Sequence, residues 1–192
     1  MNFSSDLVVD HEAINKAIVY LKAGKIIAYP TEAVFGLGCD PFNEMAVHNL
    51  LAVKQRTLAK GLIVIASQWQ QVKCWVQTLT KNQLIQLNET WPGPTTWVFP
   101  ASRQVPPWIM GEHKTIAIRI TKHPIANALC ELFGQPLIST SANLSGQSPA
   151  KTTGEVVQYF SDTIDFVVPG AVGDQERPTV IKDIMTGKII RA

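Results

Sequence analysis

The sequence of 192 residues lacks the features that mark several large protein classes. It has three cysteines and no Cys-x-x-Cys pair, so neither a disulfide framework nor a zinc knuckle is expected. Its longest apolar runs are about strand length, well short of the roughly 20 residues of a membrane-spanning helix. The first ten residues contain two aspartates and no continuous apolar stretch, unlike a signal peptide. A cytoplasmic protein is therefore expected.

Familiar catalytic and nucleotide-binding motifs are missing as well. No Walker A motif occurs, and Gly36-x-Gly38 is not followed by a third glycine because Pro41 stands in that position. The four histidines share no metal-ligand spacing, and no Ser-His-Asp arrangement is suggested. No pair of acidic residues stands at helical spacing in an apolar frame, which disfavours carboxylate acid–base hydrolysis. We expect no metal site built from protein ligands.

Charge is unevenly distributed along the chain, although the net charge is only +2. From Leu51 to His123 there are nine Lys or Arg residues against two Glu, an excess of seven positive charges. If this region folds into one face, it can attract an anionic ligand. Scattering of these cations over solvated faces remains an equal alternative.

Helical and strand patterns interleave and predict one mixed α/β domain over residues 1–192. Helices are expected after Asp10, after Asn43, from about Thr80, over 124–133 and over about 153–160. Strands are expected at 25–29, 61–66, 95–99, 115–120, 136–140 and 165–170, and a final hairpin over 179–192. The middle and final strands need not be parallel, so a mixed sheet is expected.

Three segments carry polar groups at strand or helix ends. In "AYPTEAVFGLGCDP" (28–41), Pro30 ends a strand and places the Thr31 hydroxyl where α/β sheets bind ligands. Gly36 and Gly38 permit close backbone approach, although a plain turn is the simpler reading.

The second segment is Lys54-Gln55-Arg56, at the expected end of a helix. Cations there complement the helix dipole, which is one sufficient explanation. Alternatively, an extended exit from the helix would put Lys54 and Arg56 on one side, where an ammonium and a guanidinium suit a triphosphate.

The third segment is "STSANLSG" (139–146). Ser139, Ser141 and Asn143 alternate directly after a strand, so their side chains could point the same way. Hydroxyl and amide groups can donate to phosphate oxygens or hold the waters of Mg²⁺. A Ser/Asn-rich turn explains each residue singly.

Together with "WPGPTTWVFP", "AIRIT" and "RPTVIKDIMTGKIIRA", these segments resemble the threonylcarbamoyl-AMP synthase family of the YrdC/TsaC type, in its short single-domain form. The motifs cover nearly the whole chain in family order. The resemblance implies a YrdC-like domain: a twisted mixed sheet with flanking helices around a large basic concave cavity. It also implies a nucleotidyltransferase that converts L-threonine, bicarbonate and ATP to threonylcarbamoyl-adenylate and pyrophosphate, for the t⁶A modification at position 37 of tRNA.

The resemblance also implies roles for residues. Lys54 and Arg56 would be catalytic and hold the nucleotide phosphates. Mg²⁺ would accompany ATP. The residues implied to bind threonine are Thr31, Thr115, Arg119 and Thr179, and those implied to bind ATP besides the two cations are Ser139, Ser141 and Asn143. The chain departs from the family pattern at Thr57 and Gly61, after the two cations, and at Val180, where a hydroxyl is lost.

Partners are expected to be these small substrates and a tRNA threonylcarbamoyl-transferase complex that receives the adenylate, with RNA a further possibility. The alternative function is a non-catalytic module that binds tRNA, rRNA or double-stranded RNA through the basic middle of the chain. Aromatic residues interleaved with Lys/Arg, typical of single-strand binding, are not found. The compact group of Ser139, Ser141 and Asn143 favours a small ligand.

Overall fold

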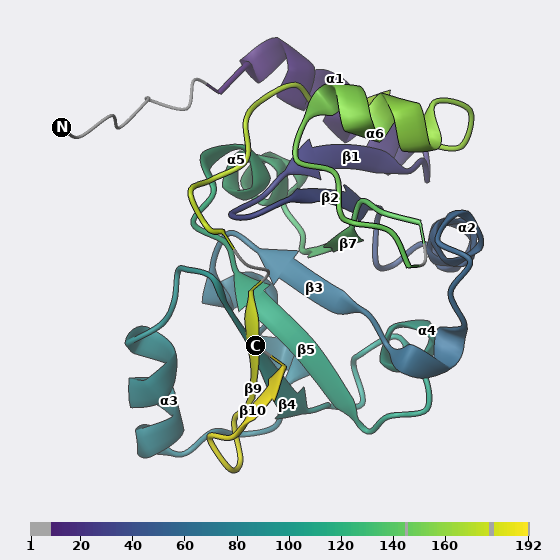
Figure 1. The fold of residues 1–192 in the computed structure, drawn as a ribbon. Helices are drawn as coiled ribbons and strands as arrows, with labels where there is room; N and C mark the ends of the chain where they lie inside the picture. The colour runs from purple at the N-terminus through teal and green to yellow at the C-terminus, as the bar shows by residue number, and fades with distance from the viewer. Residues whose placement is uncertain (1–8, 145, 177–178, 192) are drawn as a thin grey trace, which may run out of the picture.

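A computed structural model describes residues 9–144, 146–176 and 179–191 (Figure 1). The helices are α1 His11–Lys22, α2 Glu44–Val53, α3 Lys81–Asn88, α4 Pro107–Met110, α5 Pro124–Phe133 and α6 Thr153–Phe160, with short 3₁₀ turns at Leu58–Lys60, Trp69–Gln71 and Lys73–Trp75. The strands are β1 Ile27–Pro30, β2 Phe35–Gly38, β3 Ile63–Ala66, β4 Thr95–Pro100, β5 Thr115–Ile120, β6 Leu137–Ile138, β7 Thr140–Ser141, β8 Phe166–Val167, β9 Val180–Asp183 and β10 Ile189–Arg191. The mixed α/β class expected from the sequence is confirmed.

The helix starts expected from capping residues are confirmed. The Asp10 carboxylate accepts hydrogen bonds from the first turn of α1, and the Asn43 side chain accepts one from the Ala46 amide in α2. Thr80 forms a reciprocal capping box with Gln83 at the start of α3. Local side-chain chemistry therefore fixes where these helices begin. Within the described residues, no helix is long and apolar enough to cross a membrane.

The strands form two mixed sheets where the sequence suggested one. One sheet has the order β7-β2-β1-β8, and the other has the order β10-β9-β4-β5-β3-β6. The chain passes between them at Ser139, because Ile138 pairs with β3 while Thr140 pairs with β2. The expected strand 136–140 is thus split, and Ser139 lies at the point where the sheets meet. The expected terminal hairpin is confirmed by antiparallel pairing of β9 with β10.

Alternating side chains divide the core between two faces. Ile65 of β3 packs with Ile27 and Tyr29 of β1 in one cluster with α1 and α5, and in Figure 1 α1 lies above β1 and α5 beside it. Val64 and Ala66, on the opposite face of β3, belong to the larger cluster that includes β4, β5 and α2. Both sheets are therefore held by a shared apolar core, which fixes the crevice between their edges.

Candidate active site

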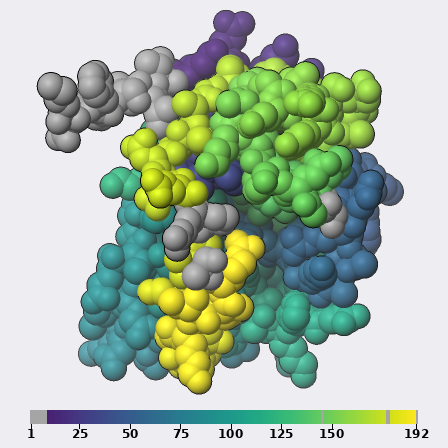
Figure 2. Space-filling view, viewed as in Figure 1, coloured from purple at the N-terminus to yellow at the C-terminus, as the bar shows by residue number. Residues whose placement is uncertain are grey.

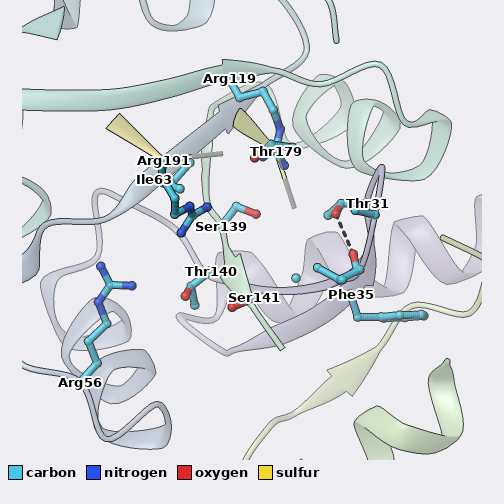
Figure 3. A pocket seen from close by; sticks show the side chains of 13 residues that line it. Thr31, Phe35, Arg56, Ile63, Arg119, Ser139, Thr140, Ser141, Thr179 and Arg191 are labelled. Carbon is cyan, nitrogen blue, oxygen red and sulfur yellow. Dashed lines mark hydrogen bonds between the residues drawn. The ribbon is translucent and has the colours of Figure 1, made fainter. Parts of the chain in front are cut away.

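A pocket opens between the two sheets. Figure 2 shows the surface hollowed between the yellow C-terminal hairpin and the green segment after Ser141. In Figure 3, Arg119, Thr179 and Thr31 lie on one side, Arg56 on the other, and the segment 139–141 between them. Residues from β1 to β10 line it: Thr31, Ala33, Val34, Phe35, Gly36, Arg56, Ile63, Arg119, Ser139, Thr140, Ser141, Thr179 and Arg191. Segments far apart in the sequence therefore converge here.

The elbow after β1 forms the back of this pocket. The Thr31 hydroxyl donates to the Val34 carbonyl at 2.7 Å, which fixes its orientation while its oxygen can still accept a hydrogen bond (Figure 3). The chain then turns back as β2, an unexpected strand that pairs with β1. A Cβ on Gly38 would overlap the Ile138 carbonyl, and one on Gly36 would lie 3.2 Å from Ser139 Oγ. The predicted close backbone approach at these glycines is confirmed.

At one end of the pocket, the Arg119 guanidinium is buried and neutralised. Its Nη2 lies 3.4 Å from Glu32 Oε2, and its Nη1 donates to Thr179 Oγ1 at 3.0 Å. Burial alone would raise the pKa of Glu32, but the charge of Arg119 and hydrogen bonds from Thr121 and Lys122 hold it below its ordinary value. Arg119, Thr31 and Thr179 thus line one pocket, as the family resemblance implied. Arg177 and Pro178, which precede Thr179 in the family motif, lie outside the described residues.

At the other end, Lys54 is held by neutral oxygens. Its ammonium donates to the Ser141 carbonyl at 2.6 Å, to Asn143 Oδ1 at 2.8 Å and to the Asn143 carbonyl. The three donors of this ammonium therefore all contact the segment 141–143, and Lys54 lines a second pocket that adjoins the first. Burial, followed by the charge of Arg56, lowers the pKa of Lys54 to about 8.

The Arg56 guanidinium faces both pockets and is held by a carbonyl. Nη2 donates to the Gly61 carbonyl at 2.7 Å, while burial and the charge of Arg191 lower the pKa of Arg56 below its ordinary value. The expected extended geometry is wrong, because Gln55 is left-handed with φ 48° and ends α2 in a Schellman motif. The turn sends Lys54 and Arg56 to different oxygens. Within the part of the chain that the structure describes, neither cation has a carboxylate within 4 Å.

The segment 139–143 links the two ends. Ser139 and Ser141 both line the first pocket, but Thr140 between them lines it too, so the predicted alternation does not hold here. Asn143 departs from it as well, because its amide N–H donates to the Ser141 carbonyl in a turn. Its side chain lines the second pocket and receives hydrogen bonds from Lys54 and from Ser141 Oγ. The three residues therefore span both pockets.

Thr115 does not meet the other residues that the sequence analysis assigned to threonine. It lies four strand residues from Arg119, about 13 Å at the usual rise of a strand, and it does not line the pocket that holds Arg119. It lines a third, adjoining hollow together with Arg56, Lys60 and Arg191.

Two charged residues of the site were missed in the sequence. Arg191 lines the first pocket from β10, and the only local signal was its place in the strand of the terminal hairpin. Glu32 stands directly behind Arg119, and its signal was a carboxylate within an otherwise apolar buried stretch.

Comparisons with known proteins identify the family of this chain. The Sua5/YciO/YrdC family model, described as telomere recombination, matches residues 19–192. A threonylcarbamoyl-AMP synthase of Coxiella burnetii (strain RSA 493 / Nine Mile phase I) is 49% identical over 94% of this chain and 97% of its own length. One of Klebsiella pneumoniae is 47% identical over 94% and 95%. The crystal structure of P. abyssi Sua5 complexed with L-threonine superposes with a TM-score of 0.86 at 30% identity, over 92% of this chain and 52% of that one.

Proposed function

Because the chain belongs to the Sua5/YciO/YrdC family, we propose that it is a threonylcarbamoyl-AMP synthase. It joins L-threonine, bicarbonate and ATP to threonylcarbamoyl-adenylate and releases pyrophosphate, as a nucleotidyltransferase. The observation that carries the proposal is the pocket with two unlike ends: a neutralised, buried guanidinium at one and, among the described residues, cations without carboxylate partners at the other. The first suits a single carboxylate, and the second suits a polyphosphate.

The Arg119 end takes threonine. Arg119 donates to the amino acid's carboxylate, and the hydroxyls of Thr31 and Thr179 accept from or donate to its polar groups. These side chains lie on or beside β1, β5 and β9, elements fixed by sheet pairing, so they are held in place before the substrate arrives.

The Lys54 end takes ATP. Arg56 and Arg191 face the pocket with their positive charges, and Lys54 adds a third charge while holding the segment 141–143. Ser139 supplies a hydroxyl donor for phosphate oxygens, whereas the Ser141 hydroxyl and the Asn143 side-chain amide donate within the segment 141–147 and fix its shape around Lys54. Thr115, in the third hollow beside Arg56, belongs to the nucleotide side by its position.

The reaction needs positioning and charge neutralisation more than a side-chain nucleophile. Threonine's amine and bicarbonate give a carbamate and water; a carbamate oxygen then bonds to the α-phosphorus as the bond to the β-phosphate oxygen breaks and pyrophosphate leaves. Arg56, Arg191 and Lys54 lie where the negative charge of the leaving group gathers. No Cys-His or Ser-His pair is required.

Mg²⁺ enters with ATP as part of the substrate. Among the described residues, no group of three or more His, Cys, Asp or Glu could hold a metal ion. The hydroxyl and amide groups of 139–143 fit an ion that keeps its waters and is bound mainly by phosphates. The adenylate is labile, so it passes to a tRNA threonylcarbamoyl-transferase complex that completes t⁶A at position 37 of tRNA.

Pyrophosphate release from ATP, Mg²⁺ and bicarbonate, with and without L-threonine, tests this function. Wild type should release pyrophosphate only with threonine, and Lys54→Ala combined with Arg56→Ala should lower the rate by about 10² to 10³. Lys73→Ala with Arg103→Ala is the control, because it removes the same charges at exposed positions. Absence of threonine-dependent release by folded wild type contradicts the synthase, and retention of RNA binding would then favour the RNA-binding alternative.

A further inference from the structure

Glu32 is a buried carboxylate that does not line the pocket. It follows Thr31 directly and is only 7% exposed, so its charge must be balanced inside the protein. We propose that Glu32 is a positioning residue that fixes the Arg119 guanidinium in the orientation needed for the threonine carboxylate. The proposal rests on the proposed function and adds a residue that acts through Arg119 without touching the substrate.

The Glu32 carboxylate is fixed independently of Arg119. Oε1 accepts hydrogen bonds from Thr121 Oγ1 at 2.7 Å and from the Lys122 amide at 3.1 Å. The Glu32 main-chain carbonyl accepts a further bond from the Gln175 amide at 3.1 Å. The segment that follows β5 and the segment before β9 therefore both hold this residue in place.

The guanidinium is in turn held on two sides. Glu32 Oε2 lies 3.4 Å from Nη2, and Thr179 Oγ1 accepts from Nη1 at 3.0 Å. Thr179 Oγ1 also lies 3.4 Å from Thr96 Oγ1, where β4 and β9 pair and both threonines are buried. The ion pair with Glu32 on one side and the hydrogen bond to Thr179 on the other limit how far the guanidinium can turn.

Replacing Glu32 by glutamine has two opposite effects. Loss of the negative charge makes Arg119 more attractive to the substrate carboxylate. However, the oxygen of the introduced amide would still accept from Thr121 and Lys122, so the amide NH₂ would face the Nη2 donor and push the guanidinium away. A displacement of about 1 Å in a positioned group can cost about 100-fold, which exceeds the gain from one screened charge. Threonine binding should therefore weaken.

The test measures KM for threonine and KM for ATP by pyrophosphate release. Glu32→Gln should raise KM for threonine by about tenfold or more, with KM for ATP within about twofold. Thr121→Val, which removes one of the two donors to Oε1 and keeps the charge, should raise KM for threonine by a smaller factor, and it carries the test if Glu32→Gln does not fold. Glu131→Gln makes the same chemical change at an exposed position of α5 and is the control.

A double-mutant cycle separates positioning from a general structural role. In an Arg119→Leu background, Glu32→Gln should change KM for threonine by less than about twofold, because the group through which it acts is gone. Additive effects overturn the proposal, as does a lower KM for threonine in Glu32→Gln, which would make Glu32 a competitor of the substrate carboxylate. Equal rises in both KM values also overturn it. An inactive folded wild type overturns the proposed function and this proposal with it.

Discussion

The two ends of the pocket hold their cations by different means. Arg119 is paired with the buried Glu32 carboxylate, whereas Lys54 and Arg56 are held by carbonyl and amide oxygens of 61 and 141–143. A carboxylate cancels the charge that it orients, while a carbonyl orients a cation and leaves its charge intact. One end is therefore prepared for a single carboxylate, and the other retains the field that a polyphosphate needs.

The largest expected difference between the ends is in stability. Arg119→Leu leaves Glu32 buried without its counter-charge and should lower the free energy of unfolding by about 3–5 kcal/mol. Lys54→Met removes a cation that has only neutral acceptors among the described residues and should cost about 1–2 kcal/mol. Urea unfolding of both variants measures this difference. Equal losses of unfolding free energy in the two variants would mean that Glu32 does not depend on the charge of Arg119 for its stability in the buried site.

The next difference concerns pH. Because the pKa of Lys54 is about 8, its ammonium should lose its proton as pH rises from about 7 to about 9. The affinity for ATP should fall by about tenfold over this range, since the attraction between one unit charge and a nearby phosphate is worth about 1–4 kcal/mol. Titration calorimetry with ATP alone measures this affinity at each pH. Threonine is left out because its own amine titrates in the same range. Lys54→Arg keeps its positive charge throughout this range, so its affinity for ATP should not change with pH. A fall in affinity in this variant would contradict the assignment of the pH dependence to Lys54.

The same group affects stability with a defined sign. The folded pKa of about 8 lies below the ordinary lysine pKa of 10.5, so the unfolded chain binds more protons between these values. The contribution of Lys54 to the free energy of unfolding should therefore rise with pH between about 8 and 10.5. In Lys54→Met, the free energy of unfolding should not show this rise between about pH 8 and 10.5. Urea unfolding of the variant and of wild type at several pH values measures the difference.

Much of the fold was predictable because local chemistry marks element ends. Asp10, Asn43 and Thr80 act as caps through side-chain bonds that reach only into the first turn of each helix. Strand β2 was missed because Gly36 and Gly38 lower strand propensity, and the benefit of each glycine comes from Ser139 and Ile138, about a hundred residues away. The expected strand 136–140 is split between two sheets for a similar reason, because its two halves pair with β3 and β2, which lie far away in the sequence.

The residues of the candidate site likewise divide into those marked by local motifs and those whose role depends on distant partners. Thr31, Arg119, Ser139 and Thr179 were identifiable by their motifs, and the structure brings them to one pocket. Arg191 and the Glu32–Arg119 pair were not identifiable, since their partners come from distant strands. The left-handed Gln55 also escaped prediction, because glycine is the usual residue at that position of a helix end.

Gln55 gives a smaller prediction at the Lys54 end. A non-glycine residue at φ 48° is strained, so Gln55→Gly should stabilise the protein by about 0.5–1 kcal/mol. Gly134 ends α5 at φ 76° with open space around its missing Cβ, so Gly134→Ala should destabilise by about 1 kcal/mol. Thermal or urea unfolding compares the two. A rise in KM for ATP in Gln55→Gly would show that the glutamine side chain itself matters.

The smallest expected effect is in the response to salt. The cations at the Lys54 end have no carboxylate partner among the described residues, so added ions should screen their attraction for ATP. Between about 50 and 500 mM NaCl, KM for ATP should rise several-fold, while KM for threonine should change by less than about twofold because Arg119 is buried and paired. Sodium glutamate in place of NaCl separates screening from chloride binding. Equal rises in both KM values would mean that threonine and ATP experience the same electrostatic potential. Glu32 would then not reduce the positive potential at the Arg119 end of the pocket.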